Sequence, residues 1–261
     1  MVRFCLLASP IGPSRTRLGR VSALHQIAAC ALALLALPMA SARAEDGPTF
    51  VKPVVQEIEG WQVWVDPALL EGPHAEAGAE SLRMLSGHLQ RIAILVPEPA
   101  LSRLRQVVIR IEHDNPTLNG MQYHPSEGWL RNNGHDPTLA RQVHIPEARQ
   151  LLSREQLLKH PAVVLHELAH AYHDQFLGFD QPEVIAAYEA ARDAGTYESV
   201  LLYNGREVRH YGLTDHKEYF AEATEAFFYR NDFFPFVRAE LRRHDPEMES
   251  LLEKLWESKG E

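Results

Sequence analysis

The chain has 261 residues, of which 26 are basic and 35 are acidic, giving a formal net charge of −9. This acidic balance disfavours nucleic acids and anionic membrane surfaces as partners, and it is compatible with basic peptides or proteins. The sequence contains no repeat, low-complexity tract or clear linker, which excludes a repeat array and indicates one domain.

The first 44 residues have the features of a secretory signal peptide. Three arginines within residues 15–20 precede an apolar run over residues 27–37, and Ala42-Arg43-Ala44 matches an A-x-A cleavage site. The apolar run is shorter than the about 20 residues that span a membrane, although an uncleaved anchor remains an alternative. We therefore expect the protein to be exported, as a secreted or periplasmic protein, after cleavage near Ala44.

Cleavage would leave a mature domain over residues 45–261, and its 217 residues suit one sizeable core. Cys5 and Cys30 would both be lost with the leader, which excludes a disulfide and a zinc site of the cysteine type. The leader carries five arginines and no acidic residue, so its removal would change the formal charge to −14. We expect no stable membrane partner after cleavage.

The N-terminal half of the mature domain predicts a small mixed sheet. Strands are expected over three ranges, namely 58–65, 106–112 and 141–145. The range 141–145 is a candidate sheet edge for pairing with an extended peptide. Helical periodicity covers residues 74–94, although Gly78 and Gly87 weaken it. Residues 115–136 are rich in Asn, Gly, Pro and His, which is typical of an active-site wall.

The motif H-E-L-A-H, from His166 to His170, is the most informative feature of the chain. On a helix, residues four apart lie on one face about 6 Å apart along the axis, so both imidazoles can reach one metal ion. Glu167 points about 100° away and can act as general base on a water at that ion. Uncharged flanks, with Pro161 and Gly178 as end signals, predict a buried helix.

A catalytic zinc usually takes three protein ligands, so the motif needs a third one. His173 lies one turn too far along the helix to meet an ion between His166 and His170. The longer motif H-E-x-x-H-x-x-G-x-x-H is also absent, since Phe176 stands where that motif has its third histidine. We therefore expect His173 beside the site or at the surface. The alternative for the whole motif is a core helix with two hydrogen-bonded histidines and no metal.

A hairpin is predicted at Asn204-Gly205, between two stretches rich in β-branched and aromatic residues. Tyr211 ends the second stretch, just before a predicted helix start. From there its phenol can be directed at a metal-bound carbonyl and donate to an oxyanion. An ordinary half-buried strand tyrosine explains the same position equally well.

Three glutamates, Glu218, Glu222 and Glu225, share one stripe of a predicted helix. Like charges on one stripe repel, so a nearby cation would explain their grouping. We expect Glu218 to be the third metal ligand and Glu222 to accept a hydrogen bond from a ligand histidine. The alternative is a capping box between Glu218 and Asp215, with the other two glutamates solvated.

The stretch from Tyr211 to Ala223 resembles the corresponding stretch of gluzincin zinc metallopeptidases, in particular the catalytic domain of anthrax lethal factor. In that family a tyrosine lies seven residues before the metal-binding glutamate, which opens an E-[FY]-F-A-E-A run. Here the run is E-Y-F-A-E-A, and the likeness covers residues 160–230. The resemblance implies three zinc ligands, namely His166, His170 and Glu218.

The resemblance also implies roles for three neighbouring residues. Glu167 would be the general base, and Tyr211 would stabilise the oxyanion or protonate the leaving amine. Glu222 would be a carboxylate that supports a ligand histidine.

Together these features predict an α+β fold, a single zincin-like metallopeptidase domain with a helical C-terminal part over residues 233–244 and 246–256. The expected function is an exported metallopeptidase, an endopeptidase rather than an exopeptidase, with Zn²⁺ as cofactor and a peptide or protein as substrate. No organic cofactor is expected. Two alternatives stay open: a zinc-binding, non-catalytic exported binding module with a zincin-like fold, and a structural protein that binds no metal.

Overall fold

The computed structural model of the protein describes residues 50–257. The predicted signal peptide at residues 1–44 and its cleavage site at Ala44 lie outside the described residues, and so do both cysteines. Within the described part, no helix is both long enough and apolar enough to cross a membrane.

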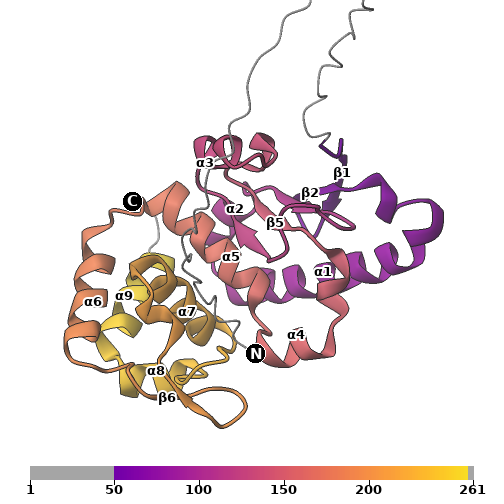
Figure 1. The fold of residues 1–261 in the computed structure, drawn as a ribbon. Coiled ribbons are helices and arrows are strands. Elements are labelled where there is room, and N and C mark those ends of the chain that lie inside the picture. The colour runs from indigo at the N-terminus through magenta and orange to yellow at the C-terminus, as the bar shows by residue number, and fades with distance from the viewer. Residues whose placement is uncertain (1–49, 258–261) are drawn as a thin grey trace, which may run out of the picture. The chain divides into compact units, whose positions relative to one another are not determined.

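The N-terminal half folds into a five-stranded mixed sheet with strand order β1-β2-β3-β5-β4. Its strands are β1 (Val54–Ile58), β2 (Trp61–Val65), β3 (Ile109–Ile111), β4 (Gln122–Tyr123) and β5 (Val143–Ile145). The inner strands β2, β3 and β5 run parallel, whereas the edge strands β1 and β4 are antiparallel to their neighbours. Most of the remaining structure is helical (Figure 1), so the predicted α+β class with a small N-terminal mixed sheet is confirmed.

Two predictions about the sheet are wrong. The strand expected over residues 58–65 is interrupted by a turn at Glu59-Gly60, where φ is 53° and 89°. Apolar and aromatic residues flank the turn on both sides, which concealed it. The strand expected over residues 141–145 is the inner strand β5, and the edge is β4 instead. Strand β4 has only two residues, too few to show the alternation of apolar and polar residues by which a strand is recognised.

Helix α1 (Ala75–Leu95) confirms the helix predicted over residues 74–94, and its buried face joins the main hydrophobic core. Gly78, which weakened that prediction, has a packing role. A Cβ at Gly78 would lie 2.0 Å from the backbone oxygen of Leu69, so only glycine lets α1 approach the preceding turn this closely.

The other α-helices of the described residues are α2 (Ala100–Leu104), α3 (Glu127–Asn132), α4 (Arg154–Lys159), α5 (Val163–Tyr172), α6 (Pro182–Asp193), α7 (His216–Phe228), α8 (Arg238–His244) and α9 (Pro246–Glu257). The helix predicted over residues 233–244 starts five residues late, as α8. Pro235 accounts for part of the delay, because a proline disfavours the helical conformation of the residue before it, here Phe234. Helix α9 corresponds to the prediction over residues 246–256.

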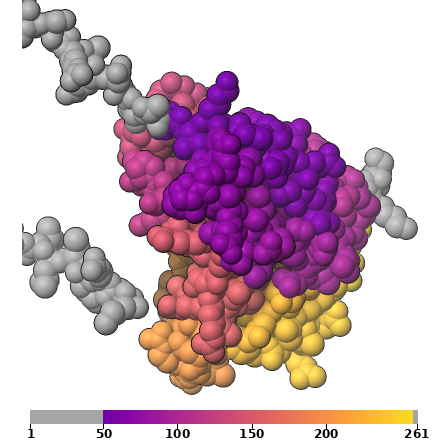
Figure 2. All heavy atoms as spheres, turned by 90° about the vertical axis from the view of Figure 1, so that its right-hand side faces the viewer, coloured from indigo at the N-terminus to yellow at the C-terminus, as the bar shows by residue number. Residues whose placement is uncertain are grey.

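Helices α5 and α7 pack against each other where the two halves of the fold meet (Figure 1). Helix α5 also contacts α1, β4 and β5, whereas α7 also contacts α6, α8 and α9. Figure 2 shows the same division at the surface, with the N-terminal half in indigo and magenta above the orange and yellow C-terminal half. The α5–α7 contact therefore connects the sheet to the helical part.

Helix α5 begins two residues after Pro161, the predicted start, and continues as a π-helix (His173–Leu177). The π-helix ends at Gly178, with φ 84° and ψ 135°. The positive φ explains why glycine ends the segment, although a ψ of 135° lies outside the left-handed helical region in which many helices end.

The predicted hairpin is confirmed as β6 (Val200–Leu201) and β7 (Glu207–Val208), which pair antiparallel around a turn with Gly205 at φ 82°. An isolated bridge between Leu202 and Phe233 joins this hairpin to the segment that follows α7. The hairpin thereby lies beside the C-terminal end of α7.

We predict that Gly78→Ala lowers the free energy of unfolding by about 1–3 kcal/mol, because overpacking against fixed backbone exceeds the helix propensity that alanine gains. Gly87→Ala in the same helix is the matched control, since nothing lies within 4 Å of a Cβ there. This control should gain about 0.5–1 kcal/mol. Urea denaturation followed by circular dichroism measures both changes. Equal stabilisation of the two variants would contradict the packing role of Gly78.

Candidate metal centre

Helices α5 and α7 bring together three predicted ligand atoms. His166 Nε2 lies 3.2 Å from Glu218 Oε2 and 3.1 Å from His170 Nε2. His170 Nε2 lies 3.3 Å from the same oxygen of Glu218. The three atoms form a nearly equilateral triangle, and these residues are a group that can hold a metal ion. The histidines come from α5 and the carboxylate comes from α7.

The N-terminal cap of α7 places Glu218 in this group. The side chain of Asp215 accepts hydrogen bonds from the backbone N–H of Lys217 at 2.8 Å and of Glu218 at 3.0 Å. The Glu218 side chain points to the α5 histidines, and not back to Asp215 as a capping box would require. Burial raises the pKa of Glu218, but hydrogen bonds from His166 and His170 outweigh it and hold the pKa well below its usual range. The carboxylate therefore stays ionised, as a metal ligand must be.

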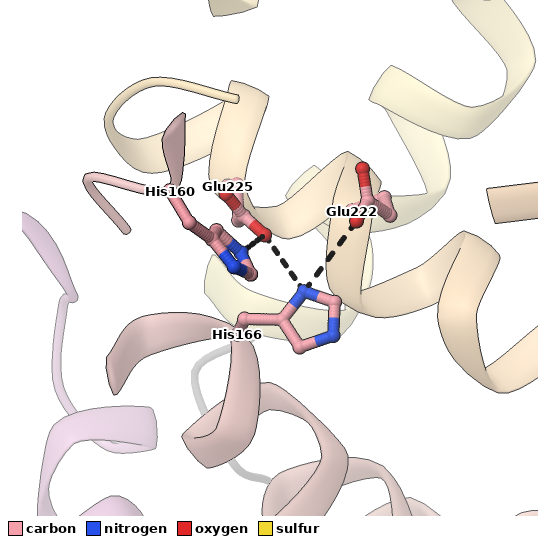
Figure 3. A group of neighbouring side chains, drawn as sticks. All are labelled: His160, His166, Glu222 and Glu225. Carbon is pink, nitrogen blue, oxygen red and sulfur yellow. Dashed lines mark hydrogen bonds and ion pairs between the residues drawn. The ribbon is translucent and has the colours of Figure 1, made fainter. Parts of the chain in front are cut away.

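The second ring nitrogen of His166 is bound by Glu225. His166 Nδ1 lies 2.7 Å from Glu225 Oε1, whereas the nearer oxygen of Glu222 is 3.8 Å away (Figure 3). The prediction that Glu222 accepts this hydrogen bond is therefore wrong. Nδ1 and Nε2 lie on different sides of the ring, so one carboxylate cannot reach both. Glu218 and Glu225 can do so because they lie seven residues apart on α7, which is about two helical turns.

His160, just before α5, donates to the same oxygen of Glu225, with Nε2 at 2.9 Å (Figure 3). His160, His166, Glu222 and Glu225 are a second group that can hold a metal ion. However, one oxygen of Glu225 lies at hydrogen-bond distance from both imidazoles. We therefore describe this group as a hydrogen-bonded chain in which Glu225 orients His166 and leaves Nε2 to face the first group.

The pKa values of Glu222 and Glu225 are shifted in opposite directions. Burial raises the pKa of Glu225, but the charge and hydrogen bond of His160 and the hydrogen bond of His166 outweigh it and lower the pKa. Burial and the charge of Glu225 both raise the pKa of Glu222 to about 8. Burial lowers the pKa of His160, yet Glu225 outweighs it and raises the value to about 9. Glu225 is thus the ionised acceptor, and Glu222 keeps its proton at neutral pH.

Glu167 leaves α5 in a different direction from the two ligand histidines, as predicted. Its Oε2 accepts a hydrogen bond from the backbone N–H of Tyr123 in β4, at 2.7 Å. The carboxylate is buried but lines the same cleft as the ligand triangle. It is therefore held at the sheet edge, facing the space in front of the triangle.

Tyr211 opens a 3-10 helix (Tyr211–Leu213) directly before α7 and lies in no strand, so the ordinary strand tyrosine is excluded. Its side chain is 49% exposed and lines the cleft. The turn is fixed by His210 Nδ1, which accepts from the backbone N–H of Gly212 at 2.9 Å. Burial and the charge of Glu218 raise the pKa of Tyr211, so the phenol keeps its proton as a donor.

The cleft has a volume of about 890 Å³ and runs between β4, α4, α5 and the first turn of α7. Its chemically important lining residues are His160, His166, Glu167, His170, Tyr211 and Glu218. Five predicted site residues thus meet in one cavity of the size of a substrate site. Glu222, the sixth predicted residue, also lines it, without the hydrogen bond that we assigned to it.

His173 is fully buried, contrary to the expectation of a surface position. Its ring packs against Phe179 and Phe220 at centroid distances of 5.2 Å and 4.7 Å, and neither ring nitrogen has a hydrogen-bond partner. Burial lowers its pKa to about 3. His173 lies outside the metal-binding groups, as predicted.

Sequence reasoning missed His160 and the role of Glu225. Glu225 was recognised on the glutamate stripe, but a stripe does not show which member meets a neighbouring helix. His160, the residue before Pro161, belongs to none of the motifs of the sequence. A histidine placed six residues before His166 carries no helical period with it, so no local signal connects the two.

No protein family matches the chain, and no similar protein was found among curated sequences or solved structures. The resemblance to the gluzincins therefore depends on the motif residues alone.

We predict that Glu225→Gln weakens Zn²⁺ binding by roughly 10–100-fold, because outer hydrogen-bond partners of ligand histidines have effects of this size. Glu222→Gln on the same helix is the matched control and should change the affinity little, since Glu222 is already protonated. Competition with a chromophoric chelator at pH 7 measures both affinities. A larger loss in Glu222→Gln than in Glu225→Gln would contradict our assignment of the orienting carboxylate.

Proposed function

We propose that the protein is an exported, zinc-dependent metallopeptidase of the gluzincin type with a zincin-like fold. It would hydrolyse internal peptide bonds of a peptide or protein. The observation that carries the proposal is the triangle of His166, His170 and Glu218 at the wall of a cleft that also contains Glu167.

The ligand triangle fits zinc in both geometry and chemistry. A tetrahedral zinc with bonds of about 2.0–2.1 Å separates its ligand atoms by roughly 3.3–3.4 Å. The separations here are 3.1, 3.2 and 3.3 Å. Two histidines and one glutamate are also a ligand set of catalytic zinc sites, which keep a fourth position for water or substrate.

When bound, zinc would polarise a peptide carbonyl and lower the pKa of a water molecule towards about 7. Glu167 would take the proton of that water at a carboxylate oxygen and later pass it to the leaving nitrogen. The backbone N–H of Tyr123 would keep the carboxylate in place during this proton transfer, because it donates a hydrogen bond to one oxygen of Glu167. Tyr211 would donate its phenolic proton in a hydrogen bond to the developing oxyanion.

The exposed edge of β4 supports an extended peptide as substrate. One side of β4 pairs with β5, and its other side borders the cleft. Residues alternate between the two sides of an antiparallel strand, and the Tyr123 N–H on the outer side donates to Glu167. The carbonyl of Tyr123 points the same way and can accept a hydrogen bond from an added strand. A substrate bound in this way could extend beyond the site in both directions, as an endopeptidase requires.

The alternative of a non-catalytic zinc-binding module receives less support. Such a module has no use for a carboxylate beside the ligands, whereas Glu167 is buried at the cleft and held by its own hydrogen bond. Incubating the mature protein with a mixed peptide library, with zinc content measured on the same sample, tests the proposal. Stoichiometric zinc without any cleavage would favour the binding module.

We predict that Glu167→Gln keeps the fold and the zinc but lowers kcat by roughly 10²–10⁴-fold, the usual contribution of a general base. The amide matches the carboxylate in shape and cannot take the proton. Glu155→Gln, which removes an exposed carboxylate from the rim of the same cleft, is the control. Undiminished turnover by Glu167→Gln would remove this residue from the mechanism.

We predict that Tyr211→Phe lowers kcat by roughly 10²–10³-fold, as the loss of one oxyanion donor does. KM and melting temperature should hardly change, because the hydrogen bond strengthens only as charge develops. Tyr229→Phe serves as control, since this partly exposed tyrosine lies under Arg91, away from the cleft. A normal kcat together with a depressed melting temperature would show that Tyr211 is structural.

A further inference from the structure

The edge strand β4 is attached through Tyr123 at two points, one on α5 and one on the π-helix that continues it. The backbone N–H of Tyr123 donates to Glu167 Oε2 at 2.7 Å, and its phenol donates to Asp174 Oδ2 at 2.5 Å. Glu167 and Asp174 are seven residues apart along one continuous helical stretch, Glu167 in α5 and Asp174 in the π-helix. One tyrosine therefore contacts both ends of a two-turn stretch of the helix.

The outer attachment is reinforced from the π-helix. Gln175 Nε2 donates to the Tyr123 hydroxyl at 3.2 Å and to the backbone oxygen of Arg141 at 3.1 Å. Arg141 has a φ of 62°, a conformation that residues other than glycine seldom adopt. The neighbouring His173 is buried in the core on aromatic rings. The π-helix is thus held by the core on one side and by β4 on the other, and such segments are frequent at functional sites.

The phenol remains a hydrogen-bond donor over the whole neutral range. Burial and the hydrogen bond to Asp174 raise the pKa of Tyr123 well above its usual value. A hydroxyl that donates to a carboxylate forms one of the stronger hydrogen bonds in proteins. The bond between Tyr123 and Asp174 is therefore a lasting attachment of β4.

The attachment matters because Glu167 depends on it. Within the described part of the chain, the Tyr123 N–H is the one hydrogen bond recorded for the Glu167 carboxylate. That N–H belongs to a strand of two residues, paired on one side. The position of this N–H is therefore set by the pairing with β5 on one side and by the contacts of the Tyr123 side chain.

We infer that Asp174 is a positioning residue for the general base, acting through the Tyr123 phenol on β4 and through the Tyr123 N–H on Glu167. The inference rests on the proposed peptidase function. Asp174 touches neither the metal ligands nor the reacting atoms. Its effect is to keep the carboxylate of Glu167 in the orientation in which it can take a proton from the attacking water.

Turnover by four variants tests this inference. Tyr123→Phe and Asp174→Ala each remove the bond, and both should lower kcat about 10-fold with zinc retained, since a misplaced catalytic group costs up to about 100-fold. Asp174→Asn keeps an oxygen acceptor and should retain most of the turnover. The double variant Tyr123→Phe/Asp174→Ala should again lose about 10-fold and not 100-fold, because both changes break one bond.

Tyr197→Phe is the matched control. It removes another buried phenol–carboxylate bond, from Tyr197 to Asp245 at 3.0 Å, away from the cleft. Its melting temperature should fall as in Tyr123→Phe, while kcat per zinc stays normal. A purely structural role for the Asp174 bond predicts that the two variants behave alike in both measurements.

Hydrogen exchange of the Tyr123 amide adds a measurement that needs no activity. In metal-free protein, Asp174→Ala should accelerate this exchange about 10-fold, whereas Asp174→Asn and Tyr197→Phe should leave it unchanged.

Unchanged exchange together with unchanged kcat in Asp174→Ala would overturn the role of Asp174 and leave the proposed peptidase function standing. Multiplicative losses of kcat in the double variant would do the same. A wild-type protein that holds zinc but cleaves no peptide would overturn the proposed function, and with it the role of Asp174 in positioning a base. Exchange would then still show whether the attachment of β4 exists.

Discussion

The candidate site depends on the two contacts that the His166 imidazole makes with carboxylates of α7. Each of its ring nitrogens faces a carboxylate of α7, Glu218 at 3.2 Å from Nε2 and Glu225 at 2.7 Å from Nδ1. A short, rigid ring bound at both ends constrains how the two helices lie against each other, together with the core residues packed between them. That arrangement in turn brings His170 within reach of Glu218. Because α5 also contacts the sheet and α7 contacts the helical part, the same ring connects the halves of the fold.

Such a cluster is costly to bury, since each desolvated charge loses several kcal/mol of hydration. The structure offsets this cost by pairing, with His160 and His166 on Glu225, and by leaving Glu222 protonated. Apolar residues of similar volume would often stabilise a fold equally well. Proteins keep charged groups in place of such apolar residues mainly at functional sites. The burial of these groups beside an open cleft therefore supports a metal-dependent activity over a structural role.

Local patterns predicted much of the site and only part of the fold. The four-residue spacing of His166 and His170, the periodicity of α1 and the Asn-Gly turn each depend on near neighbours, and each was recovered. The choice between Glu222 and Glu225 depends on how α7 crosses α5, which no single helix encodes. Strand β4 is too short to carry a period, and its place at the sheet edge follows from pairing with β5. What sequence reasoning missed is therefore tertiary in origin.

We propose that α5 and α7 together form one zinc site from two histidines and one glutamate. Anomalous diffraction at the zinc absorption edge, on crystals of the zinc-loaded mature protein, tests it most directly. We predict one zinc peak, about 2.0–2.2 Å from His166 Nε2, His170 Nε2 and one oxygen of Glu218. A peak between His160 and Glu225 on the other side of the His166 ring, or no peak at all, would contradict it.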